Sequence, residues 1–292
     1  MEILIDPRSG FCFGVKRAIN MAEKQAADGK SIYCLGEIVH NEEEVNRLRS
    51  LGIHFIDRKT YFKLANCKVM IRAHGEPPET YDYARSNGIE LIDATCPVVL
   101  RLQEKIKNVE QTFPNAQIVI FGKQDHPEVV GLRGQIEKSI IIETIDDISK
   151  VDCTKPVFLF AQTTKDKHVY SEIRKKITRE LLDHGLSEED LVVFSSICGQ
   201  VANRAPWLIE FSRTVDSLLF VGGKLSSNSK ILFEACRQNN PHSYFITKAD
   251  DVEKIRLDSR HKIGITGATS TPSWLIEAVA DRIRQYFATN VK

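Results

Sequence analysis

Three cysteines of the sequence stand where a thiol can act as a metal ligand or a nucleophile. Cys12 lies in GFCFG, Cys96 in DATCP and Cys198 in SSICG, and each follows a short apolar run and precedes a predicted helix. Pro97 is favoured at the first helical position and so places Cys96 at a helix N-terminus. Because that end of a helix stabilises negative charge, these positions favour thiolate, the form that binds metal or attacks a substrate.

The other four cysteines and both tryptophans fit ordinary packing, within apolar runs, near strand starts or on predicted helices; they are Cys34, Cys67, Cys153, Cys236, Trp207 and Trp274. Three thiolates without a fourth would leave one iron of a four-iron cluster free of a protein ligand. Zinc held by three cysteines is the inorganic alternative. The wide spacing of the three along the chain matches no short metal-binding signature, so it does not decide between the two.

Three of the eight histidines, His40, His74 and His126, lie at the ends of apolar runs. An imidazole can donate a hydrogen bond to an anionic ligand such as a diphosphate, although each of the three is also explained as a loop cap. Glu128 stands two positions after His126 and is a candidate proton donor, with a first-turn helix charge as the alternative. The SSNS and TST motifs place hydroxyl and amide donors at two further helix starts, where ordinary N-caps look the same.

These polar motifs follow strands in a repeating pattern of strands and helices. Eleven short runs rich in Val, Ile and Phe predict strands, and amphipathic stretches between most of them predict helices. In open α/β sheets, ligands bind beyond the carboxyl ends of strands, beside helix N-termini. We therefore expect one site from eight clusters, at 39–41, 73–79, 95–97, 125–128, 162–164, 195–198, 226–229 and 268–272.

The composition is that of an ordinary globular protein, with 292 residues, 42% hydrophobic and 27% charged residues and a net charge of +1. That charge gives no overall basic field for nucleic acid or an anionic membrane. No apolar run approaches the ~20 residues that span a bilayer, and we expect a cytoplasmic location without disulfides. The strand number exceeds one simple sheet and predicts an α/β fold of three small lobes with mainly parallel sheets, residues 1–96, 97–196 and 197–292.

In their order along the chain, the motifs resemble those of the 4-hydroxy-3-methylbut-2-enyl diphosphate reductase family. They are GFCFGVKRA, GEIVHN, AHG, DATCP, HPEV, QTT, SIC with an arginine further on, SSNS and GATSTP, and they span residues 9–276. The resemblance implies a pseudo-threefold arrangement of the lobes around one [4Fe–4S] cluster. Cys12, Cys96 and Cys198 would hold this cluster, and its open apical iron would bind the allylic hydroxyl of the substrate.

The resemblance also implies the roles of the remaining motif residues. The diphosphate would be held by His40, His74, His126, Ser226, Ser227, Asn228 and Ser270. Glu128 would supply protons through Thr163, whose hydroxyl lies near the substrate oxygen. The implied reaction is the reductive dehydroxylation of 4-hydroxy-3-methylbut-2-enyl diphosphate to isopentenyl and dimethylallyl diphosphate, the last step of the non-mevalonate isoprenoid pathway. Ferredoxin or flavodoxin would deliver the two electrons.

The sequence departs from the commoner family pattern at Phe13, Arg72, Glu76, Asp125 and Leu225, and in the segment SICGQVANRA, residues 196–205. None of these replaces a proposed ligand or the acid, so we expect changes in pocket polarity and shape rather than in the reaction. Two other functions remain open from the residues alone. One is a non-redox enzyme with a single nucleophilic thiolate. The other is a binding or sensing protein that carries a cluster without turnover.

Overall fold

The computed structural model describes residues 2–27, 32–224 and 226–290, except for the side chains of Ser227 and Asn290. Two compact units make up the chain: Met1–Phe55 with Asn203–Lys292, and Ile56–Ala202. The described strands form three sheets of four strands each. This confirms the prediction of an α/β protein with three small lobes built on parallel sheets.

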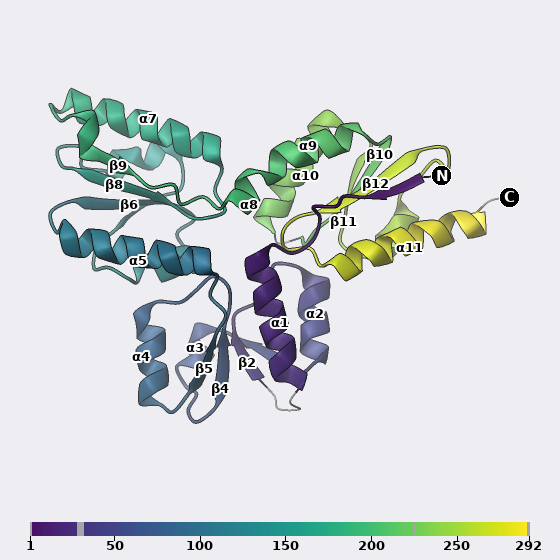
Figure 1. Cartoon of the computed structure of the whole chain (residues 1–292), viewed down its shortest axis with the longest axis horizontal. Coiled ribbons are helices and arrows are strands. Elements are labelled where there is room, and N and C mark those ends of the chain that lie inside the picture. Colours follow the sequence, from purple (N-terminus) through teal and green to yellow (C-terminus); the bar gives the residue numbers. More distant parts are fainter. Residues whose placement is uncertain (1, 28–31, 225, 291–292) are drawn as a thin grey trace. The chain divides into compact units, whose positions relative to one another are not determined.

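In the unit Ile56–Ala202, one complete sheet has the strand order β7-β6-β8-β9. Its strands are β6 (Gln117–Phe121), β7 (Ile140–Ile142), β8 (Val157–Ala161) and β9 (Leu191–Val193). Helices α5 (Pro97–Thr112) and α7 (Lys167–Asp183) cover opposite faces of this sheet (Figure 1). Because side chains alternate along a strand, Ile118 and Ile120 pack on α5 while Val119 and Phe121 pack on the α7 side.

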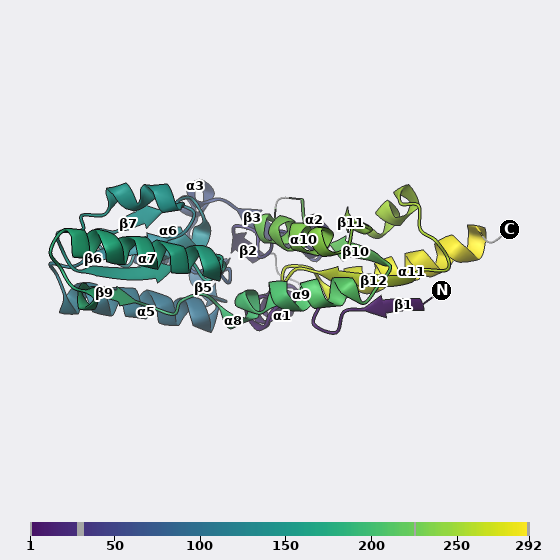
Figure 2. The same cartoon turned by 90° about the horizontal axis from the view of Figure 1, so that it is seen from above.

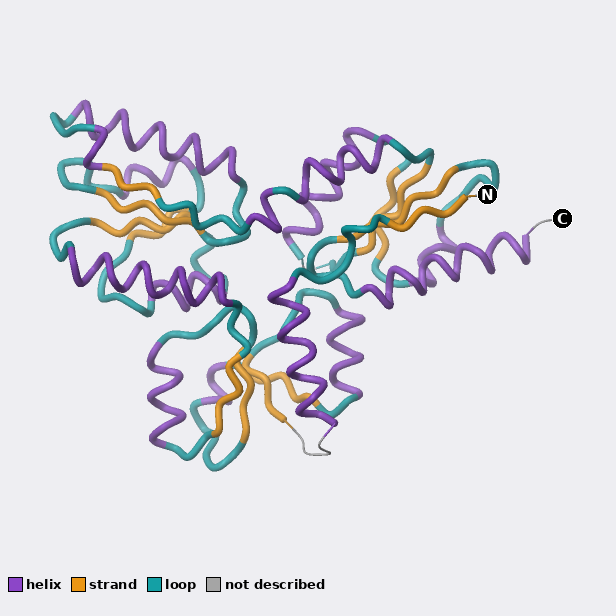
Figure 3. The backbone as a smooth tube through the Cα atoms, in the orientation of Figure 1, coloured by secondary structure: helices purple, strands orange, loops and turns teal. Residues whose placement is uncertain are grey.

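The same unit contains β4 (Lys68–Ile71) and β5 (Glu90–Asp93), which pair in parallel in the sheet of order β3-β2-β4-β5. Loops follow the carboxyl ends of the strands (Figure 3), and the unit also contains several short helices. These elements are α3 (Arg58–Tyr61), α4 (Pro78–Ser86), α6 (Pro127–Arg133), α8 (Gly199–Ala202) and the 3-10 helices η1 (Ile145–Lys150) and η2 (Glu188–Asp190).

The other unit contains the sheet β1-β12-β10-β11, whose first strand comes from the N-terminal end of the chain. Strand β1 (Glu2–Ile5) pairs in parallel with β12 (Lys262–Gly267) and lies beside it (Figure 2). The remaining strands are β10 (Ser217–Val221) and β11 (Ser243–Ile246). Helices α9 (Arg204–Arg213) and α10 (Ser227–Asn239) cover one face, and α11 (Ser273–Asn290) covers the other, with η3 (Ala249–Lys254) packed against α11.

This unit also supplies β2 (Ile32–Leu35), β3 (Ile53–Ile56), α1 (Phe13–Ala27) and α2 (Glu42–Ser50). Each of the eleven predicted runs overlaps an observed strand, but β3 was not predicted. His54 is exposed between buried Ile53 and half-buried Phe55, so its polar side chain interrupts the apolar run from which strands were predicted. The proposed lobe limits, 1–96, 97–196 and 197–292, stay a prediction. No helix in the described part of the chain is long and apolar enough to cross a membrane.

Candidate functional site

The unit Ile56–Ala202 contains a buried carboxylate that receives two hydrogen bonds from one threonine. Glu128 is in the first turn of α6 and is 2% exposed. The backbone N–H of Thr163 donates to Oε1 of Glu128 at 2.7 Å, and its hydroxyl donates to Oε2 at 2.8 Å. Burial raises the pKa of Glu128 to about 7, although the two hydrogen bonds oppose the rise. A carboxyl group with this pKa is able to give or take a proton near neutral pH.

His126 caps the helix that carries Glu128 and lies next to His74. Nδ1 of His126 accepts the backbone N–H of Glu128 at 3.2 Å, so the proton of the neutral ring is on Nε2. The rings of His126 and His74 meet edge to face, with centroids 5.2 Å apart. His74 follows β4, and Gly75 after it has φ +73°, a conformation that favours glycine. The two histidines are therefore in contact, whereas their binding of an anion stays a prediction.

The backbone of Cys96 is hydrogen-bonded to the loop that carries His74, and the backbone of Cys198 to the loop that carries Thr163. Cys96 is the N-cap of α5, as predicted, and its N–H donates to the carbonyl of Ala73 at 3.0 Å, next to His74. The N–H of Cys198 donates to the carbonyl of Thr163 at 2.9 Å. Both thiols are free and partly exposed. A cavity of about 290 Å³ lies beside Cys198, lined by α5 and the segment 194–199.

In the other unit, Cys12 directly precedes α1 and lies against the loop after β12. Its N–H donates to the carbonyl of Thr269 at 3.2 Å, and its carbonyl accepts the N–H of Lys16, as expected for a residue at a helix start. Ser270 is the next residue of that loop. Its hydroxyl oxygen is buried and has no hydrogen-bond partner in the described ranges 2–27, 32–224 and 226–290. A buried hydroxyl of this kind is suited to a bound polar ligand.

His40 and the serine-rich motif also meet in this unit. A β-carbon at Gly223 would lie 2.1 Å from the carbonyl oxygen of His40, so the two segments are in close backbone contact. Ser226 is the N-cap of α10 and accepts the N–H of Ser229 at 3.2 Å. Asn228 in the first turn is partly buried. The side chain of Ser227 lies outside the described residues, as does Leu225.

Asn41, next to His40, is a possible ligand that was missed in the sequence. It is 2% exposed, and its Oδ1 accepts the N–H of Glu44 at 3.1 Å as the N-cap of α2. Its Nδ2 is buried and has no partner among the described residues. In the sequence, the only sign of a role for Asn41 is its place in the VHN motif, where the adjacent histidine is the more obvious candidate ligand.

A buried ion pair fixes the loop that leads to Cys12 and was also missed. NH2 of Arg204 donates to Oδ2 of Asp6 at 2.8 Å, and both side chains are at most 5% exposed. The same nitrogen donates to the carbonyl of Gly267 at 2.6 Å, at the end of β12 and two residues before Thr269. Nε1 of Trp207 donates to the other oxygen of Asp6 at 2.7 Å. These contacts join the residue after β1 to α9 and to the end of β12, so they hold the start of the loop that leads to Cys12 close to the strand that precedes Thr269.

The donor set fits an iron–sulfur cluster in its chemistry. Cys12, Cys96 and Cys198 are each partly exposed, and each lies at a helix start. Thiolates are the usual ligands of such clusters, and helix N-termini favour the charged form. Of the four cysteines predicted to be packing residues, Cys34, Cys153 and Cys236 are buried, whereas Cys67 is partly exposed like the three candidate ligands.

The comparison with protein families agrees with the motifs. The family model described as LytB protein matches residues 3–284. The chain belongs to the LytB protein family. A relative of this LytB protein in Bacteroides thetaiotaomicron is 47% identical over 287 residues, covering 97% of this chain and 98% of the relative. A relative in Bacteroides fragilis is 46% identical with the same coverage, and both are named 4-hydroxy-3-methylbut-2-enyl diphosphate reductase.

Solved structures place this LytB protein in the same group. A structure of (E)-4-hydroxy-3-methyl-but-2-enyl diphosphate reductase, described as the terminal enzyme of the non-mevalonate pathway, matches with a TM-score of 0.75 and 32% identity, covering 98% of this chain and all of that one. The corresponding reductase from Plasmodium falciparum matches with a TM-score of 0.78 and 26% identity, covering 96% and 87% of the two chains. The family resemblance inferred from the motifs is thereby confirmed.

Proposed function

We propose that this LytB protein catalyses the reductive dehydroxylation of 4-hydroxy-3-methylbut-2-enyl diphosphate to isopentenyl and dimethylallyl diphosphate. The allylic C–O bond breaks, a C–H bond forms, and two electrons and two protons are consumed as the oxygen leaves as water. Relatives of this name cover almost the whole chain. The observation in the molecule that carries the proposal is the buried pair of Glu128 and Thr163, because a dehydroxylation needs a proton donor out of contact with water.

Cys12, Cys96 and Cys198 would hold one [4Fe–4S] cluster and leave an apical iron without a protein ligand. When bound, the cluster supplies the electrons and a Lewis-acidic iron. The contribution of the chain is to present three thiolates from helix starts, two of them on loops whose backbones also fix His74 and Thr163. This set favours iron–sulfur chemistry over a single nucleophilic cysteine, since three equivalent thiols share one context.

Glu128 would deliver the proton through the hydroxyl of Thr163. With a pKa of about 7, the carboxyl group is protonated in a substantial fraction of molecules at neutral pH. The hydroxyl of Thr163 donates to the ionised carboxylate of Glu128; when Glu128 is protonated, the hydroxyl instead accepts the carboxylic proton and passes its own proton on. The backbone N–H of Thr163 holds the other carboxyl oxygen, which fixes the orientation of the acid.

The diphosphate would be bound by neutral donors rather than by a dense set of cations. The proposed donors are His40, His74, His126, Ser226, Ser227, Asn228 and Ser270, and we add the amide of Asn41. Since Nδ1 of His126 accepts the N–H of Glu128, the neutral ring carries its proton on Nε2 and is a hydrogen-bond donor there. The buried hydroxyl of Ser270 and the buried amide nitrogen of Asn41 have no partner in the described part of the chain, as expected of groups that a ligand satisfies.

Ferredoxin or flavodoxin would supply the electrons, and we expect the cytoplasm as the compartment, where thiols stay reduced. The test is anaerobic reconstitution with iron and sulfide, followed by turnover of 4-hydroxy-3-methylbut-2-enyl diphosphate with reduced methyl viologen. We expect a brown protein, with loss of the cluster absorption in Cys96→Ser. A colourless protein that loses its activity when a single cysteine is alkylated would indicate nucleophilic catalysis. A brown protein that never consumes the substrate would indicate a sensor.

A further inference from the structure

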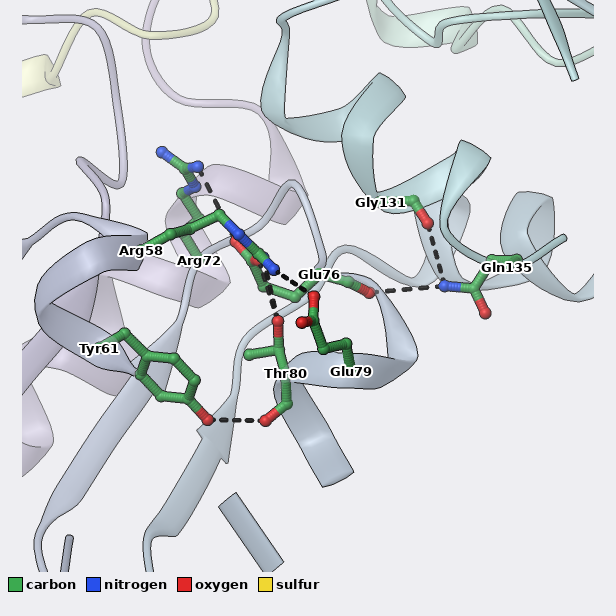
Figure 4. A network of polar contacts seen from close by, with 8 residues as sticks. All are labelled: Arg58, Tyr61, Arg72, Glu76, Glu79, Thr80, Gly131 and Gln135. Carbon is green, nitrogen blue, oxygen red and sulfur yellow. Dashed lines mark hydrogen bonds and ion pairs between the residues drawn. The ribbon is translucent and has the colours of Figure 1, made fainter. Parts of the chain in front are cut away.

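Glu76, one of the departures from the family pattern, is a buried carboxylate two residues after His74. It is 3% exposed. Its Oε2 accepts NH1 of Arg58 at 2.5 Å and the hydroxyl of Thr80 at 3.3 Å (Figure 4). Its Oε1 lies 3.9 Å from NH2 of Arg72, which directly follows β4 and is two residues before His74. The carboxylate thus links both sides of the turn to α3 and α4.

The backbone of Glu76 is held from the opposite side by the helix that carries Glu128. Nε2 of Gln135 lies 3.5 Å from the carbonyl of Glu76 and donates to the carbonyl of Gly131, in α6, at 3.0 Å (Figure 4). A β-carbon at Gly131 would lie 3.4 Å from the carbonyl oxygen of Gly75. The turn after His74 therefore packs directly on α6, where glycine allows a close approach.

These contacts decide how His74 and His126 face each other. His126 caps α6, so its ring is fixed with that helix. His74 lies in a turn rather than at the end of a helix, so its position depends on the turn formed by residues 72–76. The carboxylate of Glu76 holds that turn through Arg58 and Arg72, and the carbonyl of Glu76 holds it on α6 through Gln135. The edge-to-face contact of the two rings is the result.

We infer that Glu76 is a positioning residue for diphosphate binding, which sets the orientation of His74 relative to His126. Its buried charge acts through two arginines and never touches the substrate. The inference deepens the proposed function and rests on it for the identity of the anion. It assigns a use to Arg72 and Glu76, the two departures on either side of the AHG motif.

Glu76→Gln keeps the size of the side chain and removes its charge, so the electrostatic attraction to Arg58 and Arg72 is lost. Glu79→Gln is the matched control, since Glu79 pairs with the same Arg58 at 3.1 Å but is 71% exposed in its side chain. Each variant is prepared as the cluster-loaded protein. Three measurements follow: binding of inorganic diphosphate by calorimetry, kcat and KM with methyl viologen as reductant, and the imidazole ¹⁵N resonances.

In Glu76→Gln we expect KM and the diphosphate Kd to rise roughly five- to tenfold, the effect of one weakened charge-assisted contact, with kcat within about twofold. The imidazole signals of His74 and His126 should move, while those of exposed His54 and His184 stay. Glu79→Gln should resemble the wild type in all three measurements. Gln135→Ala, which releases the other side of the turn, should raise KM in the same direction and provides the test if Glu76→Gln does not fold.

Equal KM, Kd and imidazole signals in Glu76→Gln and Glu79→Gln would overturn the inference. So would a loss confined to kcat or to thermal stability, because a merely structural role predicts that pattern. The proposed function fails separately: in that case the wild type itself neither binds diphosphate nor consumes the substrate. The imidazole signals then still report whether Glu76 orients His74.

Discussion

Thr163 satisfies both carboxyl oxygens of Glu128 at once, with its backbone N–H at 2.7 Å and its hydroxyl at 2.8 Å. One donor belongs to the main chain and survives any substitution except proline, whereas the other depends on the side chain. Burial pushes the carboxyl towards the protonated form, and these two donors pull it back towards the charged form. The balance leaves the group able to titrate near neutral pH.

Glu128→Gln should retain the cluster and lose turnover. The amide occupies the same space and cannot donate a carboxylic proton, so the loss of general acid catalysis should lower kcat by about 10²- to 10⁴-fold. The visible absorption of the reconstituted protein serves as the control for the cluster. Full activity with an intact cluster would rule out Glu128 as the proton donor.

The activity of the wild type should fall as the pH rises through about 7, because Glu128 must be protonated to act as the acid and its pKa lies near that value. Thr163→Val removes the hydroxyl donor, which raises the pKa of Glu128 further and moves this decline to higher pH, with a lower maximum. Thr163→Ser should restore the wild-type profile. The measurement is kcat/KM against pH with a chemical reductant whose own rate is held constant.

The stability of the folded chain should also report the buried acid. The pKa of Glu128 is raised from 4.5 in the unfolded chain to about 7, so the folded protein holds a proton that the unfolded protein releases. The stabilisation that comes from holding Glu128 protonated is therefore present in full below about pH 4.5 and is lost as the pH rises through about 7. Relative to the wild type, Glu128→Gln should gain free energy of unfolding across this window, approaching about 3 kcal/mol. Urea denaturation at several pH values checks the sign.

Breaking the buried pair of Asp6 and Arg204 should destabilise the unit that carries Cys12. Arg204→Met leaves the charge of Asp6 buried and uncompensated, which typically costs about 3–5 kcal/mol of unfolding free energy. Arg213→Met is the matched control, because Arg213 pairs with Glu210 on the surface and such pairs contribute about 0–1 kcal/mol. Equal effects in urea denaturation would contradict the role assigned to the buried pair.

Gly223→Ala should separate His40 from the serine-rich motif. The new β-carbon would lie 2.1 Å from the carbonyl oxygen of His40, so the two segments must move apart. We expect the affinity for inorganic diphosphate to fall at least about tenfold, since a misplacement of about 1 Å is costly in a positioned site. Gly199→Ala, which meets no heavy atom within 4 Å, should unfold like the wild type. Unchanged affinity in Gly223→Ala would count against this part of the site.

Much of the fold was predictable because the signals are local. The apolar runs gave eleven of the twelve described strands, and Pro97 located the start of α5. Strand β3 was missed because exposed His54 interrupts its short apolar run. The position of β1 beside β12 has no local signal at all, since parallel pairing joins strands from any distance along the chain.

The candidate site was predictable where a residue type carries its own chemistry and was missed where partners define the role. Cysteines, histidines and Glu128 at strand ends stand out by type. Asp6 and Arg204 are 198 residues apart, and neither looks unusual alone. Trp207 was interpreted as a core aromatic, but its indole N–H binds Asp6 and its ring contacts Arg8. Trp274 is 38% exposed and donates to buried Glu44.

The pairing of β1 with β12 also affects the order in which this unit folds. The two strands lie far apart in the chain, since the hydrogen bond from Thr266 to Asp6 joins residues 260 positions apart. Until these strands pair, the loop that ends in Cys12 has neither the neighbouring strand nor the carbonyl of Thr269 to hold it. Because closing so long a loop costs chain entropy before the contacts repay it, the segment around Cys12 should reach its final position late in folding.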